Sequence, residues 1–307
     1  MKKTLLIVGG GGFFGKSILD FMVKKKGIEK QIKKIIIITK SSNIFLSKEL
    51  RKKFLIDHIK LDITKAKKLP YADLIIYCVI SNNYKLDHKG VKNFYNIAKQ
   101  NFVNSKIIYT SSGAVYGKQK KTNLRVKEVH FNKNKEKFDN LKKEEYAKIK
   151  IKNEKIFKNL LNYKIKVSIV RCFAFVGKHI PLKSNFVVGN FINDIINCKT
   201  INVKSKHRVL RTYMDGYDLA DCLLKIALNS KKKYEIYNIG SDDIIDIHDL
   251  ATVLGKKYKL NVKINEKFQD IIKDIYIPNI SKFRKNYEYE KKFNSLKAIN
   301  QTISELI

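Results

Sequence analysis

Residues 4–15, TLLIVGGGGFFG, constrain the fold of this chain more than any other segment. Five apolar or β-branched residues run directly into four glycines, and two phenylalanines and a fifth glycine follow. An apolar run without polar alternation predicts a strand that is buried on both faces, as in a parallel sheet. Because glycines permit a sharp turn, we expect a strand, a tight turn and then a helix over residues 13–26.

The glycine turn predicts a binding site for the pyrophosphate of a dinucleotide, with a purely structural turn as the alternative. Glycines let backbone N–H groups come close to an anion, and the amino end of the next helix favours negative charge. The pattern can be read as G-x-x-G-x-x-G from residue 9, or as G-x-G-x-x-G with the two middle glycines. The expected cofactor contacts in this segment are Gly9, Gly12, Phe13, Phe14 and Gly15.

Strand and helix signals alternate through the first half of the chain. Strand-sized apolar runs lie at residues 33–39, 54–61, 73–79, 105–111 and 164–171, and helical segments lie at 87–101 and 141–162. This alternation is typical of a doubly wound parallel sheet. The sequence therefore predicts an α/β fold of the Rossmann type, and no Pro- or Ser-rich linker divides the chain.

The formal charge of +36 over 307 residues raises the question of a nucleic-acid partner. Lys greatly outnumbers Arg, is spread over nearly every segment, and lacks the bidentate fork with which Arg grips bases and phosphates. We therefore expect a solvated basic surface that helps to capture an anionic substrate, and no specific nucleic-acid site.

The cysteines and the apolar runs indicate the compartment. Four cysteines (78, 172, 198 and 222) form no C-x-x-C pair, and no His cluster has metal-ligand spacing. We therefore expect buried thiols, no metal and a reducing cytoplasm. The longest apolar runs are only strand-sized, so we expect neither membrane insertion nor a secretory signal.

The end of the second expected strand bears on the choice of cofactor. A site that prefers NAD usually carries a carboxylate about 20 residues beyond the glycines, where it binds the ribose 2′-hydroxyl. Here the strand ends in Thr39 and Lys40, and a hydroxyl and a cation suit a 2′-phosphate. NAD and NADP both stay open, with NADP favoured. Asp62 ends the third strand, where it can meet the adenine or simply form a turn.

A catalytic constellation follows the fifth expected strand. Ser112 lies at the carboxyl end of that strand, where ligands bind in parallel sheets. Tyr146 and Lys150 are spaced i, i+4, so they share one face of a helix, and a nearby ammonium favours the phenolate. Tyr146 can then exchange a proton with a sugar hydroxyl, Ser112 can hold the same oxygen, and Lys150 can bind the nicotinamide ribose. The same spacing recurs at Tyr95/Lys99, Tyr116/Lys120 and Tyr287/Lys291, and only the order along the chain selects Tyr146.

Residues 118–143 are rich in Lys and Asn and poor in apolar residues. They predict either an exposed loop or an active-site flap, because loops at the carboxyl ends of strands surround the ligands of such sheets.

Motifs along nearly the whole chain resemble those of one family. They are GGGGFFG, SSGAVYG, YAKIK, RCFAFVG (171–177), RTYMDGYDLA (211–220), YNIGSDDIIDIHDLA (237–251) and IPNISKFRK (277–285). In this order they resemble an extended short-chain dehydrogenase/reductase of the NAD-dependent epimerase/dehydratase family, which acts on nucleotide sugars. The resemblance implies that Ser112, Tyr146 and Lys150 form the catalytic triad, and that Arg211 contacts the substrate phosphates.

The resemblance also implies a domain organisation. Residues 1–172, with 204–229 returning to them, would form the dinucleotide-binding domain, and 173–203 with 230–307 mainly a smaller substrate-binding lobe. Dimerisation would use the two helices at 87–101 and 141–162.

At several positions the sequence differs from the family pattern, and these differences bear on the reaction and on the substrate contacts. Dehydratases of the family carry an Asp-Glu pair directly after the catalytic hydroxyl residue, and this chain has Gly113 and Ala114 there. Val79-Ile80 replaces an Ala-Ala pair, and Ala174 replaces an Asn. We expect Asn190 to provide a compensating contact to the substrate.

The leading hypothesis is an NAD(P)-dependent nucleotide-sugar epimerase or oxidoreductase that works at sugar C4 with Tyr146 as acid and base. A 4-keto-6-deoxysugar reductase would use the same residues, and a 4,6-dehydratase fits less well. The alternative from another class is a noncatalytic NADP-binding scaffold or sensor. The family likeness also suggests synthesis of surface-polysaccharide precursors.

Overall fold

The computed structural model describes residues 2–40, 44, 46–81, 83–131, 137–138, 140–182 and 186–307. The chain forms two compact units. The first unit contains Met1–Val115, Asn140–Cys172 and Ala220–Tyr237, and the second contains Tyr116–Asp139, Phe173–Leu219 and Asn238–Ile307.

The first unit is built around a parallel sheet of seven strands. In chain order its elements are β1 (Lys3–Val8), α1 (Phe13–Lys24), β2 (Ile32–Thr39), α2 (Lys48–Lys53), β3 (Leu55–Lys60), β4 (Leu74–Tyr77), α3 (Tyr84–Asn101), β5 (Lys106–Ser112), α4 (Leu141–Asn159), β6 (Lys166–Cys172), α6 (Gly216–Asn229, which begins in the second unit) and β11 (Tyr234–Ile239, which ends in the second unit). The strand order is β11-β6-β5-β4-β1-β2-β3, so the chain winds outward in both directions from β1 and β4. The predicted α/β fold of the Rossmann type is confirmed.

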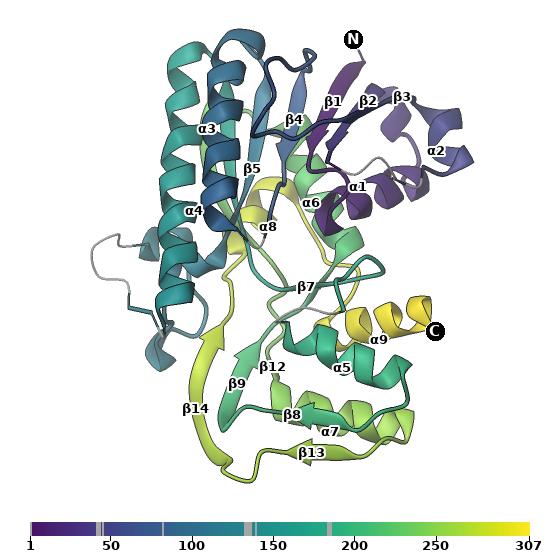
Figure 1. Ribbon diagram of the computed structural model, residues 1–307, viewed down its shortest axis with the longest axis vertical. Helices are drawn as coiled ribbons and strands as arrows, with labels where there is room; N and C mark the ends of the chain where they lie inside the picture. Colours follow the sequence, from purple (N-terminus) through teal and green to yellow (C-terminus); the bar gives the residue numbers. More distant parts are fainter. Residues whose placement is uncertain are drawn as a thin grey trace. The chain divides into compact units, whose positions relative to one another are not determined.

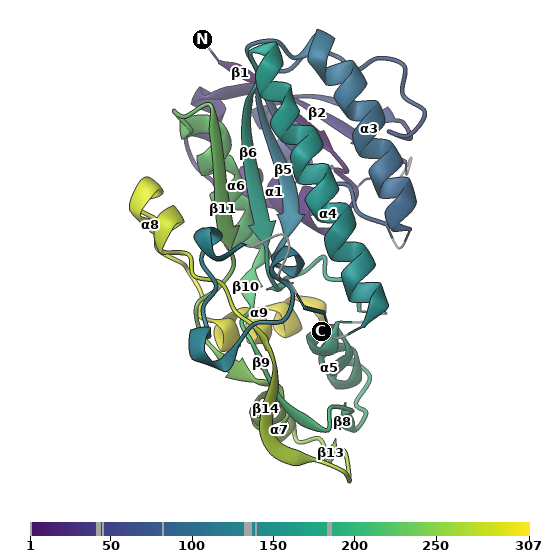
Figure 2. The ribbon, with the colours of Figure 1, turned by 90° about the vertical axis from the view of Figure 1, so that its left-hand side faces the viewer.

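Apolar strands and helix faces explain this layering. The central strands are buried on both faces, as their unbroken Ile, Leu and Val runs predicted. Figures 1 and 2 show α3 and α4 on one face of the sheet and α1 with α6 on the other. On the first of these faces, Phe94 of α3 and Phe157 of α4 pack on Tyr77 and Tyr109 of the sheet.

Three helix boundaries differ from the prediction, the first being the end of α1 at Lys24, two residues before the expected end. Helix α3 begins three residues earlier than expected, since the Asn83 side chain accepts the Leu86 N–H (3.1 Å) and caps it. Helix α4 begins where expected, after its cap Asn140, but its last predicted turn is a tighter 3-10 turn, Leu160–Tyr163.

The second unit contains short strands and helices around its own core. Its elements are β7 (Phe175–Val176), α5 (Val187–Ile196), β8 (Ile201–Val203), β9 (His207–Arg211), β10 (Met214–Asp215), β12 (Ile245–Asp246), α7 (Ile247–Tyr258), β13 (Val262–Ile264), β14 (Gln269–Tyr276), α8 (Ser281–Tyr287) and α9 (Ser295–Leu306). The strands form a three-stranded sheet β12-β9-β14 and the pairs β10-β7 and β13-β8. Apolar faces of α5, α7 and α9 meet in one core that includes Phe191, Leu250 and Ile299.

The Lys-rich segment 118–143 is described in part. It contains the 3-10 turns Lys121–Asn123 and Glu128–His130, and Val126 bridges to Pro278. Residues 132–136 and 139 lie outside the described residues, so the choice between loop and flap stays open.

The cysteines correct one expectation. Cys78, Cys172 and Cys222 are buried, but Cys198 is exposed just after α5, in the left-handed region with φ 52°. Its position in a turn directs it to the surface. Among the described helices, none is long and apolar enough to cross a membrane.

Candidate active site

The inner side of the glycine turn between β1 and α1 is packed too tightly to hold a side chain. Gly9 has φ 95°, and a Cβ there would lie 2.9 Å from the backbone of Cys78. The N–H groups of Gly9 and Gly10 donate to the Ile38 carbonyl at 2.9 and 3.1 Å, which fixes the turn against β2. A Cβ on Gly15 would lie 2.4 Å from the Cα of Gly10, so the first turn of α1 needs glycine to pack on the loop.

This turn fits a dinucleotide pyrophosphate. A Cβ on Gly12 would meet only the Gly9 carbonyl oxygen, at 3.4 Å, so the outer side of the turn is open. The first turn of α1, which is described in full, contains no acidic residue, and Gly12 caps the helix without a side chain. The amino end of α1 therefore presents N–H groups and a positive dipole to an anion. Phe13 and Phe14 begin the helix, with ring centres 5.7 Å apart.

The predicted cofactor residues at the ends of β2 and β3 lie together. Thr39 is buried, and its Oγ1 lies so close to the glycine turn that a Cβ on Gly11 would come within 2.6 Å of it. Lys40 Nζ lies 3.0 Å from Asp62 Oδ2, and Asp62 also accepts the N–H and the hydroxyl of Thr64. Partial burial raises the pKa of Asp62, but these bonds outweigh it and hold the pKa below its usual value.

The three predicted catalytic residues belong to β5 and α4. Ser112 is the last residue of β5, one residue beyond the expected strand, and its Oγ accepts the Ala114 N–H at 3.1 Å. Tyr146 and Lys150 lie one turn apart on α4. The Lys150 ammonium lies 5.8 Å from the ring centre of Tyr146 and donates to the Thr110 carbonyl at 3.3 Å, directly beside the end of β5.

Lys150 is a buried cation whose charge is stabilised by its neighbours. Its side chain is buried, and its ammonium lies 5.2 Å from the ring centre of Tyr109. Burial alone would lower the pKa of Lys150, but Tyr109, Tyr146 and Asp87 together raise it above its usual value. A permanent positive charge therefore lies next to the half-buried phenol of Tyr146.

A buried polar network, which the sequence reasoning missed, anchors α4 to the sheet. Glu154 accepts the Ser111 hydroxyl at 2.6 Å and binds Arg171 through both oxygens, at 3.1 Å from Nε and 2.9 Å from Nη2. The side chains of Arg171 and Glu154 are only 2% and 8% exposed. The spacing of Glu154, four residues after Lys150, was the signal that could have identified it.

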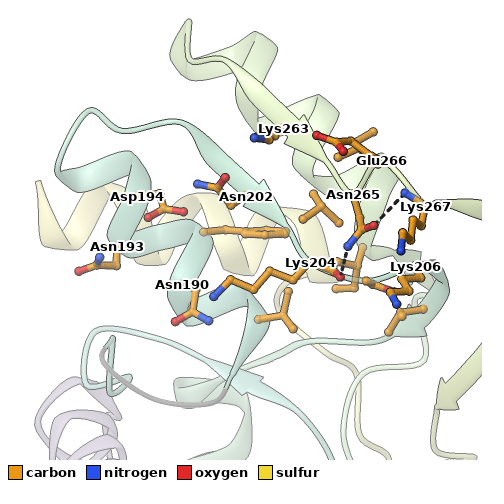
Figure 3. A pocket seen from close by; sticks show the side chains of 17 residues that line it. Asn190, Asn193, Asp194, Asn202, Lys204, Lys206, Lys263, Asn265, Glu266 and Lys267 are labelled. Carbon is orange, nitrogen blue, oxygen red and sulfur yellow. Dashed lines mark hydrogen bonds between the residues drawn. The ribbon is translucent and has the colours of Figure 1, made fainter.

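The two predicted substrate residues lie in the second unit, in different surroundings. Asn190 lines a cavity of about 750 Å³ formed by α5, β8, β13 and the loops that follow the two strands. Four lysines also line it, and Figure 3 shows the side chain of Lys204 extending toward Asn190. Arg211, at the end of β9, instead donates to Asp274 at 2.7 Å and to the Leu210 carbonyl at 2.9 Å.

Comparisons with known proteins give the same picture of the fold. UDP-N-acetylglucosamine 4-epimerase from Methanobrevibacter ruminantium M1, solved with UDP-N-acetylmuramic acid, is 20% identical with a TM-score of 0.79 over 100% of this chain and 99% of that one. dTDP-glucose 4,6-dehydratase from Bacillus anthracis, solved with NAD, is 15% identical with a TM-score of 0.76 over 99% and 96%. UDP-glucose 4-epimerase from Thermotoga maritima, solved with UDP-glucose, is 16% identical with a TM-score of 0.74 over 99% and 98%.

At these low identities, the structural similarity shows a shared fold alone. None of the curated proteins matches the chain in sequence. A sequence model of the NAD dependent epimerase/dehydratase family, however, matches residues 5–240. Since this match covers the glycine turn, β5 with its serine, and the helix of Tyr146 and Lys150, the chain belongs to the NAD-dependent epimerase/dehydratase family.

Proposed function

We propose that the chain is a nucleotide-sugar epimerase that moves a hydride reversibly at sugar C4, with Tyr146 as the acid and base. The observation that carries this proposal is the buried Lys150 ammonium beside Tyr146, at the end of the strand that bears Ser112. A scaffold or sensor would need the glycine turn but would have no use for a buried cation next to a phenol.

In the proposed mechanism each of these side chains has one task. Tyr146 takes the proton of the sugar hydroxyl as the carbon gives up its hydride, and returns it in the reverse step. Ser112 holds the oxygen that changes between hydroxyl and carbonyl. Lys150 stabilises the phenolate and binds the nicotinamide ribose. The nicotinamide nucleotide, when bound, supplies the hydride acceptor.

The same proposal assigns the other cofactor contacts. The turn of Gly9, Gly12 and Gly15 would hold the pyrophosphate at the amino end of α1, flanked by Phe13 and Phe14. Asp62 would meet the adenine, and Thr39 and Lys40 would lie at the adenosine ribose. A free ammonium there would favour NADP. The pairing of Lys40 with Asp62 reduces that preference, so we keep both NAD and NADP.

The cavity of the second unit supports a nucleoside diphosphate as the carrier of the sugar. Its charged lining residues are Asp194, Lys204, Lys206, Lys263, Glu266 and Lys267, which leaves an excess of positive charge. We propose that Asn190 contacts the nucleotide in this cavity. Arg211 would bind the phosphates of the nucleotide, and its present ion pair with Asp274 would break when it does so.

A 4-keto-6-deoxysugar reductase is the second candidate, because Thr39 and Lys40 can accommodate NADPH. A 4,6-dehydratase is disfavoured, because Gly113 and Ala114 leave no acid beside Ser112 for an elimination. We further propose a homodimer through α3 and α4, where the exposed Leu141 and a cavity of about 550 Å³ lie on the outer face of the two helices. A cytoplasmic role in making surface-polysaccharide precursors would suit such an enzyme.

The experiment that tests the proposal is to denature the purified protein and identify the nicotinamide nucleotide that it releases. Stoichiometric NAD would support an epimerase, since that reaction recycles one hydride internally. An empty protein that binds NADPH reversibly would favour the reductase. If the protein bound neither NAD nor NADPH, both the epimerase and the reductase assignments would be wrong, and a noncatalytic role would be favoured.

A matched pair of variants tests the acid–base assignment. Tyr146→Phe should abolish turnover and leave cofactor affinity nearly unchanged. Tyr95→Phe is the control, because Lys99 lies 5.8 Å from the Tyr95 ring centre, the same separation as in the proposed site. If Tyr146→Phe retained turnover, or if Tyr95→Phe lost it equally, the assignment would be wrong.

A further inference from the structure

Helices α3 and α4 pack side by side and run in the same direction (Figure 1). Near the start of α3 the ring of Tyr84 lies 5.0 Å from that of Tyr146. One turn further along α3, and about two turns further along α4, His88 Nδ1 lies 2.6 Å from the side-chain oxygen of Asn153. The residues between these contacts, on the sheet side of each helix, therefore belong to the surface where α3 packs on α4.

The residues in these positions are Asp87 and Lys150. Asp87 is 8% exposed and Lys150 is 5% exposed, and the attraction between these two buried, opposite charges raises the pKa of Lys150 and lowers that of Asp87. Ser81 fixes the carboxylate, donating its N–H at 3.1 Å and its hydroxyl at 2.8 Å. The proposed mechanism gives Asp87 no task.

The charge on Asp87 has a cost in stability. Burial raises the pKa of its carboxyl, and the bonds from Ser81 and the attraction of Lys150 offset this effect only in part. Above that raised pKa the folded chain must hold a buried anion, whereas the unfolded chain holds a solvated one. An acid kept in place at such a cost suits a role at the adjacent site better than a role in holding the fold.

We propose that Asp87 is a positioning residue that acts through Lys150: its carboxylate balances the ammonium and thereby sets the pH at which Tyr146 exchanges its proton. The part of this proposal that concerns the reaction rests on the proposed function. The part that concerns the charges of Asp87 and Lys150 does not depend on it. Without the carboxylate, the unopposed ammonium would favour the phenolate more strongly.

Other ionisable groups surround this pair, among them His88, whose Nδ1 contacts the Asn153 side-chain oxygen, and the exposed Glu145. The surrounding thiol and phenol groups are neutral near pH 7, because burial raises their pKa values; they are Tyr77, Cys78, Tyr84, Tyr109 and Cys172. Lys40, which also attracts Asp87, is paired with Asp62, and Glu154 is paired with Arg171.

The test follows the phenolate absorbance of Tyr146 at about 295 nm during a pH titration, a readout that needs no substrate. The signal of Tyr146 is the difference between otherwise identical chains with and without Tyr146→Phe. In the Asp87→Asn background this signal should appear at a pH lower by about one unit. The acid limb of the turnover profile should move by the same amount.

Two further variants make the result decisive. Ser81→Ala removes the hydroxyl that holds the carboxylate and that also bonds to the Asn83 backbone, and it should shift the titration in the same direction by less. Glu144→Gln removes a charge from α4 that is paired with Lys148 on the surface, and should leave it unchanged. An unchanged titration in Asp87→Asn, or an equal shift in Glu144→Gln, would overturn the proposal. A shifted titration in a protein that turns over no nucleotide sugar would uphold it and contradict the proposed function alone.

Discussion

The buried pair of Arg171 and Glu154 allows the most exact prediction about stability. Arg171 belongs to β6 and Glu154 to α4, and the pair is joined by two hydrogen bonds of 3.1 and 2.9 Å. The same carboxylate accepts the hydroxyl of Ser111 on β5. Changing Arg171 to Met keeps an unbranched apolar stem but removes the guanidinium, which leaves the Glu154 charge buried with the Ser111 hydroxyl as a neutral donor.

The size of the effect follows from what each variant leaves unpaired. Removing one partner of a buried ion pair costs about 3–5 kcal/mol, so Arg171→Met should lower the free energy of unfolding by that amount. Replacing both partners, as Glu154→Leu with Arg171→Met, removes the buried charges together. The Ser111 hydroxyl then lacks this acceptor, which costs about 1–3 kcal/mol. The double variant should therefore be more stable than the single one.

The measurement is urea unfolding followed by circular dichroism and by tyrosine fluorescence, since the chain has 16 Tyr and no Trp. Agreement of the two probes and an unchanged slope with urea would allow the midpoints to be converted into free energies. Lys148→Met is the control, because its pair with Glu144 is shorter, at 2.6 Å, but the two side chains are 64% and 32% exposed. That variant should cost less than about 0.5 kcal/mol. A cost below about 1 kcal/mol for Arg171→Met, or a double variant no more stable than the single one, would refute the reasoning.

Three further predictions concern other parts of the chain. Gly15→Ala should destabilise the protein by about 1–3 kcal/mol and weaken NAD(P)H binding, because the new Cβ meets Gly10; denaturation and fluorescence titration measure the two effects. Burial, together with neighbouring lysines, lowers the pKa of Lys106 to about 8, so Lys106→Met should exceed the wild type in stability at pH 7. That advantage should shrink between about pH 8 and 10.5, as the folded wild type sheds its buried charge. In the native protein, Cys198 should react with a thiol reagent far faster than the three buried cysteines.

Much of the first unit could be predicted because its signals are local. The apolar runs of β1 and β2 lie in the sequence as continuous stretches, and the glycine turn between β1 and α1 follows directly from residue types. The order of strand, serine and helix was enough to place Ser112, Tyr146 and Lys150 in one unit. The seventh strand, β11, was not predicted as a strand, because Glu235 and Asn238 interrupt the apolar residues of YEIYNI, so it lacks the continuous apolar run of the central strands.

The second unit could not be predicted in the same way, because its strands depend on partners far along the chain. Strands such as β7 and β10 have only two residues each, which is too short for a periodic pattern. Arg211 and Asp274 are 63 residues apart in sequence, so only the pairing of β9 with β14 shows that the arginine already has an acidic partner. Similarity to a family predicts that an arginine is present at this position, but it does not predict which side chain the arginine pairs with.

Helix α4 explains why the site escaped an analysis of hydrophobic pattern alone. Its buried positions are Ala147, Lys150, Asn153, Glu154 and Phe157, which follow the helical period. Three of these five residues are polar or charged. The buried face of the helix is therefore not continuously apolar where it passes the end of β5. Each buried polar group needs a partner, and the partners come from other elements: Thr110 from β5, His88 from α3, and Arg171 from β6. The interruption lowers the amphipathic signal of α4, so a helix with a weak folding pattern is the one that the proposed chemistry requires.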